Sequence, residues 1–186
     1  YIPVITSWVA GALIWKWVLS PEYGAINNIL ALFGIEGPSW LQSSKWAMPA
    51  IVLASVWKDM GYFGLMLMSG LQGINQEYYD AAAIDGAGKI KQFTRITLPL
   101  LTPTLFFVLI ISLINSFQLF TQIMIMTPDG GPLGSTMVMV ERIYKCGFRY
   151  YEMGTAAAYS WILFAILLLL TMVQMKLQNK WVNYDD

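Results

Sequence analysis

The chain has no histidine, a single cysteine and little charge over its 186 residues. Without histidine and with only Cys146, zinc sites and histidine-based catalytic triads are excluded. One cysteine cannot form an intrachain disulfide. The 11 basic and 11 acidic residues make up 12% of the chain and cancel to a net charge of zero. No basic excess exists for binding nucleic acid.

Apolar residues fill the space that charge leaves. Hydrophobic residues make up 57% of the chain and aromatic residues 15%. A typical soluble domain is about 25% charged, roughly twice the proportion found here. A neutral, charge-poor chain of this size would be poorly soluble as a free globule. The composition therefore predicts an integral membrane protein, with lipid as its surroundings.

Long apolar runs predict four transmembrane helices and an all-α bundle. Residues 96–128 and 153–175 contain no charge and exceed the roughly 20 residues that a spanning helix needs. Residues 2–19 are apolar except for Lys16, which lies near an end where its side chain can reach the interface. Residues 46–70 form a further predicted span. No internal repeat or linker divides the chain, so residues 1–186 are predicted to form one domain.

Two charges fall near the middle of the 46–70 span, where charge is costly and functional. Lys58 and Asp59 are adjacent, so on a helix they point about 100° apart and do not form a simple pair. We expect them to face the bundle interior and contact other helices. A direct functional role is the alternative.

The two outer connectors carry recognisable local patterns. In 20–45, apolar residues at helical spacing precede Gly34, which predicts a small interfacial helix. Residues 127–132 read Thr-Pro-Asp-Gly-Gly-Pro, which is turn chemistry. After the turn, Arg142, Lys145 and Arg149 share a helix face, and we interpret that face as a solvated surface.

The middle connector, residues 71–98, predicts a short helix and its stop. Asn75 is a good N-cap, and Glu77 and Asp80 lie near the positive end of the helix dipole. Gly86 and Gly88 are expected to end the helix. About nine residues give a rod of roughly 13 Å. Such a rod suits docking to a partner, although the pattern alone fits an ordinary loop helix equally well. A second helical segment, 89–97, leads into the next span.

The same connector resembles the conserved loop of permeases of binding-protein-dependent ABC importers. That signature is Glu-Ala-Ala, three residues, Gly, nine residues, then Ile-x-Leu-Pro. This chain has Asp80-Ala81-Ala82, then Gly86, then Ile96-Thr97-Leu98-Pro99, at the same spacings. Asp80 replaces Glu and keeps the charge. Trp15-Lys16-Trp17, Pro21-Glu22-Tyr23-Gly24, Trp57-Lys58 and Gly130-Gly131-Pro132 are similar to the carbohydrate-uptake, maltose-permease-like branch.

The resemblance implies an architecture and a set of partners. Such permeases have six core helices with both termini in the cytoplasm, so this chain is expected to hold the last four and to be N-terminally incomplete. The middle connector is then cytoplasmic, and 20–45 and 127–152 face outside. A second permease, usually different, completes the path; two ATPase subunits bind ATP, so this chain needs no cofactor. An extracytoplasmic binding protein delivers a carbohydrate. The expected location is a bacterial or archaeal cell membrane, crossed several times.

The short helix would then be the coupling helix, which docks on an ATPase subunit. The residues that the resemblance assigns to this docking region are Glu77, Tyr78, Asp80, Ala81, Ala82, Asp85, Gly86, Ala87, Ile96, Leu98 and Pro99.

Amide side chains are candidates for the solute path. Asn115, Gln118 and Gln122 recur at i, i+3 and i+7 and are predicted to share one helix face. Amides both donate and accept hydrogen bonds, which suits sugar hydroxyls. The same residues could instead join neighbouring helices. Lys58 and Asp59 complete the candidate set.

Other functions find less support in the sequence. Gly86-Ala87-Gly88-Lys89 lacks the spacing and the Ser or Thr of a phosphate-binding P-loop, so ATP is expected on a partner. A secondary transporter would need charges or broken helices in repeated halves, and none is visible. A membrane enzyme would need a catalytic constellation, which the scattered carboxylates do not supply. Within ABC permeases, a polyol or glycerol phosphate is the alternative solute.

Overall fold

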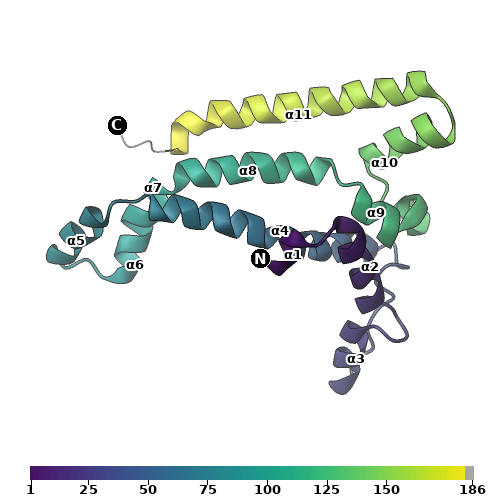
Figure 1. Cartoon of the computed structure of the whole chain (residues 1–186), viewed down its shortest axis with the longest axis horizontal. Helices are drawn as coiled ribbons and strands as arrows, with labels where there is room; N and C mark the ends of the chain where they lie inside the picture. The colour runs from purple at the N-terminus through teal and green to yellow at the C-terminus, as the bar shows by residue number, and fades with distance from the viewer. Residues whose placement is uncertain (183–186) are drawn as a thin grey trace. The chain divides into compact units, whose positions relative to one another are not determined.

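The computed structural model describes residues 1–182, without the side chains of residues 179–181. Every regular element in this range is a helix (Figure 1). The described residues form two compact units, 1–61 with 116–165 and 62–115 with 166–182. Three long helices cross the unit boundaries, and each unit is described by itself below.

The first unit contains short helices around a core of small and aliphatic residues. Its elements are α1 (Ile2–Ile5), α2 (Trp8–Val18), α3 (Ala25–Leu32), the first part of α4 (Ala47–Gln72), α9 (Thr121–Met126), η2 (Pro128–Gly130), η3 (Pro132–Gly134), α10 (Met139–Tyr144), η4 (Lys145–Arg149) and the first part of α11 (Met153–Trp181). The helix α2 packs on α9. Ala12, Ala50 and Ala54 are buried between aliphatic side chains in the core, so the helix backbones approach closely.

The second unit holds the middle connector and the helices next to it. Its elements are the remainder of α4, α5 (Gln76–Ile84), α6 (Lys89–Gln92), η1 (Phe93–Thr97), α7 (Leu98–Leu100), most of α8 (Thr102–Phe117) and the end of α11. Close packing joins α4 to α8: a Cβ added to Gly70 would lie 2.5 Å from Thr104 Oγ1 and 2.9 Å from Leu101 Cδ1. A larger residue at position 70 would therefore have to displace the side chains of Thr104 and Leu101.

Two of the predicted spans are long, continuous helices. Among the described residues, α4 and residues Met153–Gln178 of α11 are long and apolar enough to cross a membrane. The 46–70 and 153–175 predictions are confirmed as helices, and each extends beyond the predicted end.

The predicted 96–128 span is bent and then broken. The segments Lys89–Leu100 and Thr102–Phe117 meet at 62°, and they count as a third span if taken together. Pro103 has no N–H to donate to the carbonyl of Pro99, and the Thr102 hydroxyl donates to that carbonyl instead at 2.6 Å. The helix then ends at Phe117, well before residue 128.

The predicted 2–19 span is also divided, which corrects the expectation of one continuous helix. Ser7 is extended and caps α2, its side chain accepting a hydrogen bond from the Ala10 N–H at 3.2 Å. The 11 residues of α2 extend about 17 Å, far short of the roughly 30 Å hydrocarbon core. Within residues 1–182, two helices are long and apolar enough to span a membrane, or three with the bent pair, where the sequence predicted four.

Candidate functional site: the α5 helix and the intramembrane polar residues

The predicted docking helix is α5, and its ends form as expected. The Asn75 side chain accepts a hydrogen bond from the Glu77 N–H at 3.0 Å. At the other end, Gly86 has φ +75°, and the Ala87 N–H donates to the Ala82 carbonyl at 2.8 Å. This is the glycine-terminated helix end that the sequence predicts.

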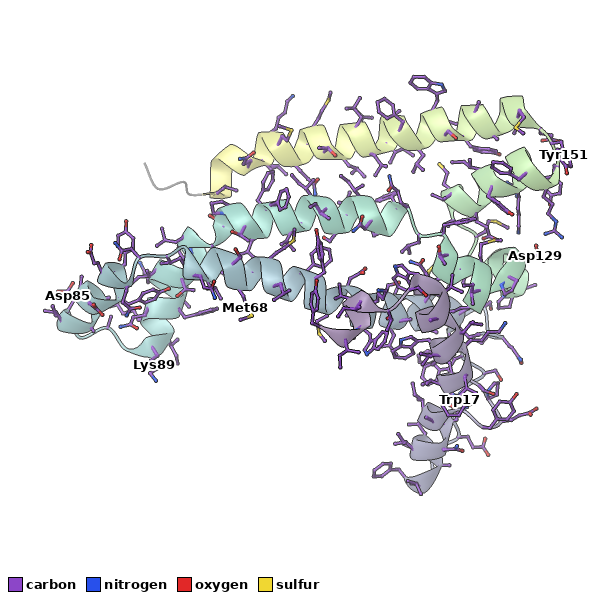
Figure 2. All side chains as sticks on the ribbon, viewed as in Figure 1. Trp17, Met68, Asp85, Lys89, Asp129 and Tyr151 are labelled. Atoms are coloured by element: carbon purple, nitrogen blue, oxygen red, sulfur yellow. The ribbon has the colours of Figure 1, made fainter. Side chains whose placement is uncertain are left out.

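Gly88 does not end α5, which corrects the prediction for that residue. It is extended and forms the N-cap of α6. The segment from Asp85 to Lys89 is therefore a turn between two helices, and Figure 2 labels these two residues at its ends. The Gln92 side chain donates to the Ala87 carbonyl at 3.1 Å and ties α6 to this turn.

Most of α5 is open to solvent. Ile84 is 88% exposed and Tyr78 46% exposed, and the alanine at 81 is exposed between them. Ile90 of α6 is 83% exposed. These are large apolar side chains on an otherwise polar connector. The acidic members of the predicted docking set are exposed as well: Glu77, Asp80 and Asp85.

The second half of the signature lies on a different helix. Ile96 belongs to η1, and Leu98 and Pro99 belong to α7, which leads into α8. Ile96 and Pro99 are half-buried, and Leu98 is exposed. The two halves of the signature are joined by a side-chain contact that the sequence did not reveal. The Tyr79 hydroxyl lies 2.9 Å from Thr97 Oγ1.

Lys58 contacts the N-terminal segment of the chain. Its ammonium donates to the carbonyls of Pro3, Val4 and Thr6 at 2.8, 3.1 and 2.7 Å. It also lies 5.7 Å from the centroid of the Trp8 ring. These carbonyls belong to the end of α1, where helix carbonyls lack intrahelical partners. Lys58 is 7% exposed, and its three donors match its three acceptors.

The expectation that Lys58 contacts other helices is confirmed, and these bonds leave none of its three N–H groups for a solute. Asp59 is half-buried, and the described ion pairs do not join it to Lys58. Among the described residues the two charges thus form no ion pair with each other, as their spacing predicts. A solute contact of Asp59 stays a prediction.

The amide stripe does not form, because the helix breaks inside it. Asn115 lies on α8, Gln118 in the irregular residues after it, and Gln122 on α9. Asn115 and Gln118 are exposed, whereas Gln122 is 4% exposed. The prediction of one shared face is wrong, because Phe120 leaves the helical conformation (φ −141°) and its ring lies 5.1 Å from that of Tyr144.

The predicted turn at 127–132 forms and carries charge. Asp129 has φ +61° and accepts a hydrogen bond from Arg149, which holds the pKa of its carboxyl below the usual range. Lys145 lies 3.6 Å from Asp129 and 3.1 Å from Glu141. Glu141 is fully buried and Lys145 is 6% exposed. The interpretation of Lys145 as part of a solvated face is therefore wrong, although Arg142 and Arg149 are exposed.

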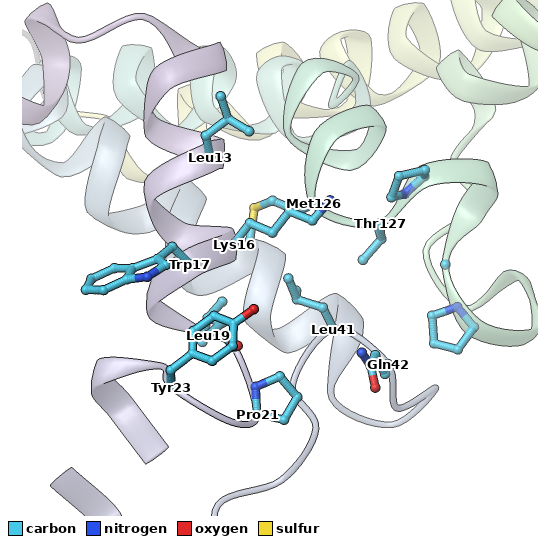
Figure 3. A pocket seen from close by; sticks show the side chains of 14 residues that line it. Leu13, Lys16, Trp17, Leu19, Pro21, Tyr23, Leu41, Gln42, Met126 and Thr127 are labelled. Carbon is cyan, nitrogen blue, oxygen red and sulfur yellow. The ribbon is translucent and has the colours of Figure 1, made fainter. Parts of the chain in front are cut away.

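A cavity of about 690 Å³ lies in the first unit (Figure 3). Three segments that resemble the sugar branch gather around it: Trp17 from α2, Pro21 and Tyr23 from the following loop, and Gly131 with Pro132 from the 127–132 turn. None of the five predicted solute-path residues lines it. Among the described residues, no three His, Cys, Asp or Glu side chains gather as metal ligands would.

Comparison with known proteins identifies a matching family and several relatives. The model of the family described as "Binding-protein-dependent transport system inner membrane component" matches residues 2–184. The probable ABC transporter permease protein YesP of Bacillus subtilis is 35% identical over 189 residues, covering 100% of this chain and 60% of that protein. The sulfoquinovosyl glycerol transport system permease protein SmoG of Agrobacterium fabrum is 38% identical over 165 residues, covering 89% and 53%.

A further relative and a solved structure are also components of transport systems. The sn-glycerol-3-phosphate transport system permease protein UgpA of Shigella flexneri is 34% identical over 184 residues, covering 99% of this chain and 62% of that protein. A crystal structure of a bacterial ABC transporter that imports the acidic polysaccharide alginate matches with a TM-score of 0.87 and 25% identity, over 97% of this chain and 63% of that one.

The all-α fold of the ABC importer type is thereby confirmed. The chain spans 53–62% of the length of these three relatives. The matched family consists of transport permeases and is not a family of enzymes. The chain belongs to the binding-protein-dependent transport system inner membrane component family.

Proposed function

We propose that the chain forms part of a permease subunit of an ATP-driven uptake system for a sugar or sugar derivative. In this proposal, α5 docks on a separate ATPase subunit, which binds and hydrolyses the ATP. The single observation that supports docking most directly is the capped helix α5, which leaves Tyr78 and Ile84 exposed next to a glycine turn. A rigid element with an open apolar surface can pass a displacement from one subunit to another.

The relatives inform the proposed solute class. Two of them are named for sulfoquinovosyl glycerol and for sn-glycerol 3-phosphate, and the structural neighbour imports a polysaccharide. A sugar or a glycerol derivative is therefore the proposed cargo, with a polyol or glycerol phosphate as the second candidate. A secondary transporter has no place for an ATPase-docking helix, and the family match weighs against it.

The proposed partners follow from the family and from the neighbouring structure. The alginate transporter forms a complex with a periplasmic protein that holds an alginate pentasaccharide. We propose an equivalent extracytoplasmic binding protein here, together with two ATPase subunits and a second, non-identical permease subunit. The proposed location is the cell membrane of a bacterium or archaeon, with the α5 region in the cytoplasm.

Site-specific photocross-linking tests the docking proposal. A photoreactive amino acid replaces Ile84 of α5 in one variant and Leu133 of η3 in a matched control. The two side chains are 88% and 97% exposed. In membranes that contain the whole transporter, we expect the probe at 84 to capture the ATPase subunit and the probe at 133 to capture the binding protein. Absence of an ATPase adduct from position 84, with the ATPase present, would overturn the proposal.

A further inference from the structure

The contact between Tyr79 and Thr97 joins the exposed helix α5 to the helical segment that enters the membrane. The two side-chain oxygens lie 2.9 Å apart, and the residues are 18 positions apart in the sequence. Tyr79 is half-buried, in contrast to its exposed neighbour Tyr78. Thr97 is 8% exposed. A hydrogen bond with one buried partner is shielded from competition by water, which makes it a defined link.

The backbone connections of α5 are poorly suited to transmitting a displacement. The connection to α4 is a turn at Gly73, between the end of α4 and the start of α5. On the side of α6, the turn contains Gly86 at φ +75° and Gly88. Glycine has the widest backbone freedom, so these turns can bend. Thr97 lies beyond the turn that contains Gly86 and Gly88. The Tyr79–Thr97 hydrogen bond therefore links α5 to η1 without depending on that turn.

Thr97 is firmly attached to the helix that follows. It is the last residue of η1, a π-helical segment of five residues, and α7 continues from it. Its carbonyl accepts a hydrogen bond from the Leu101 N–H at 2.9 Å. Leu101 and Thr104 then pack closely on α4 at Gly70. A displacement that reaches Thr97 is thus passed to the base of α8 and its packing on α4.

We propose that the Tyr79–Thr97 hydrogen bond is a strut that makes α5 and the start of α8 move as one body when the ATPase subunits close. Both side chains are positioning residues, since neither touches ATP or the solute. The proposal rests on the proposed docking role of α5. The family signature specifies neither residue: Tyr79 precedes Asp80, and Thr97 occupies the unspecified position of Ile-x-Leu-Pro.

Distance measurement by pulsed electron paramagnetic resonance tests the strut without knowledge of the solute. Cys146 is first replaced by serine, and spin labels are attached at Gln76→Cys on α5 and Leu109→Cys on α8. Both positions are exposed. The transporter, with its ATPase and partner permease, is measured with and without ATP under conditions that block hydrolysis. In the parent we expect one narrow distance that ATP leaves unchanged.

The variants separate a strut from a general structural role. Tyr79→Phe and Thr97→Val each remove one hydroxyl, and we expect a second, ATP-dependent distance whose population rises by about two- to tenfold, the usual effect of one lost neutral hydrogen bond. The double variant should be no worse than either single one. Thr97→Ser keeps the hydroxyl and should restore the narrow distance. Tyr78→Phe is the matched control and should resemble the parent.

The outcomes distinguish this proposal from the docking proposal. A single narrow distance in both Tyr79→Phe and Thr97→Val, with ATPase bound, would overturn the strut alone. Equal broadening in Tyr78→Phe, or in Thr97→Ser, would also overturn it. If the parent protein does not retain the ATPase subunit on purification, the docking role of α5 fails instead. Tyr79→Phe removes one oxygen atom, and Thr97→Val replaces a hydroxyl by a methyl group of similar size. The two variants change different elements, so either one tests the strut if the other does not fold.

Discussion

Replacing Lys58 with methionine should detach the N-terminal helix without damaging solute recognition. Lys58→Met keeps an unbranched apolar side chain but removes three hydrogen bonds to the carbonyls of Pro3, Val4 and Thr6. Hydrogen bonds to a charged group contribute about 1.5–3 kcal/mol each, so the gross loss is at least about 4.5 kcal/mol. Removing the buried charge also removes the free energy of desolvating it, which offsets part of that loss. We expect a net destabilisation of about 3 kcal/mol.

Two measurements follow the loss of these bonds. For a chain of this size, about 3 kcal/mol lowers the apparent melting temperature by roughly 6–12 °C at a fixed scan rate in detergent. Hydrogen exchange should accelerate at residues 2–8, because the carbonyls that anchor this segment lose their partner. Lys58→Arg keeps the charge and should lose less. Lys16→Met changes an exposed lysine and serves as the control.

The opposite pattern would refute this reasoning. If Lys58→Met melts with the parent and exchanges normally at residues 2–8, but raises the KM for uptake, the ammonium faces the solute rather than the N-terminal segment.

Three further predictions concern other parts of the chain. Gly86→Val forces a β-branched residue to φ +75° and should leave membrane insertion intact while uncoupling ATP hydrolysis from uptake; normal uptake by a stably expressed variant would contradict the docking role. The pKa of Asp129 is lowered by Arg149, so the pair should stabilise the fold above pH 3.8, the ordinary value, and lose that effect as pH falls through the lowered pKa. The difference in melting temperature between the parent and Asp129→Asn should therefore shrink as pH falls from 6 through the lowered pKa, and a constant difference would argue against the pair. Gln118→Ala should reduce uptake with ATPase coupling intact, and an unchanged solute profile would remove Gln118 from the path.

Local signals made the α5 region predictable from the sequence. Asn75 and Gly86 act on backbone groups within a few residues of themselves, so their capping roles follow from residue type and spacing. The turn at 127–132 was predictable for the same reason. Gly88 has similar chemistry but serves the following helix, because the turn occupies fewer residues than expected.

Interactions between distant residues were not predictable in the same way. The helix break after Phe117 carries no proline or glycine signal; Leu119 packs on the buried core of the first unit and Phe120 on Tyr144, and this packing overrides helical propensity. The partners of Lys58 are backbone carbonyls more than 50 positions away, which have no sequence signature.

The sequence did not predict the burial of Lys145 or the contact between Tyr79 and Thr97, for related reasons. Lys145 is buried and pairs with both Glu141 and Asp129, and Asp129 comes from the preceding turn. Tyr79 and Thr97 meet because the chain reverses between α5 and η1. Helical spacing in the sequence identifies which residues share a face, but it does not identify which element covers that face.

ATP-dependent uptake into reconstituted liposomes tests the central claim most directly. The full-length permease subunit is combined with its partner permease, ATPase and binding protein, and supplied with labelled maltose, glycerol and sn-glycerol 3-phosphate in separate assays. The account predicts that at least one of these solutes accumulates, that it does so only when ATP is enclosed in the lumen on the ATPase side, and that Gly86→Val abolishes this accumulation. Accumulation driven by an ion gradient without ATP, or an ATPase that does not associate with the permease, would contradict it.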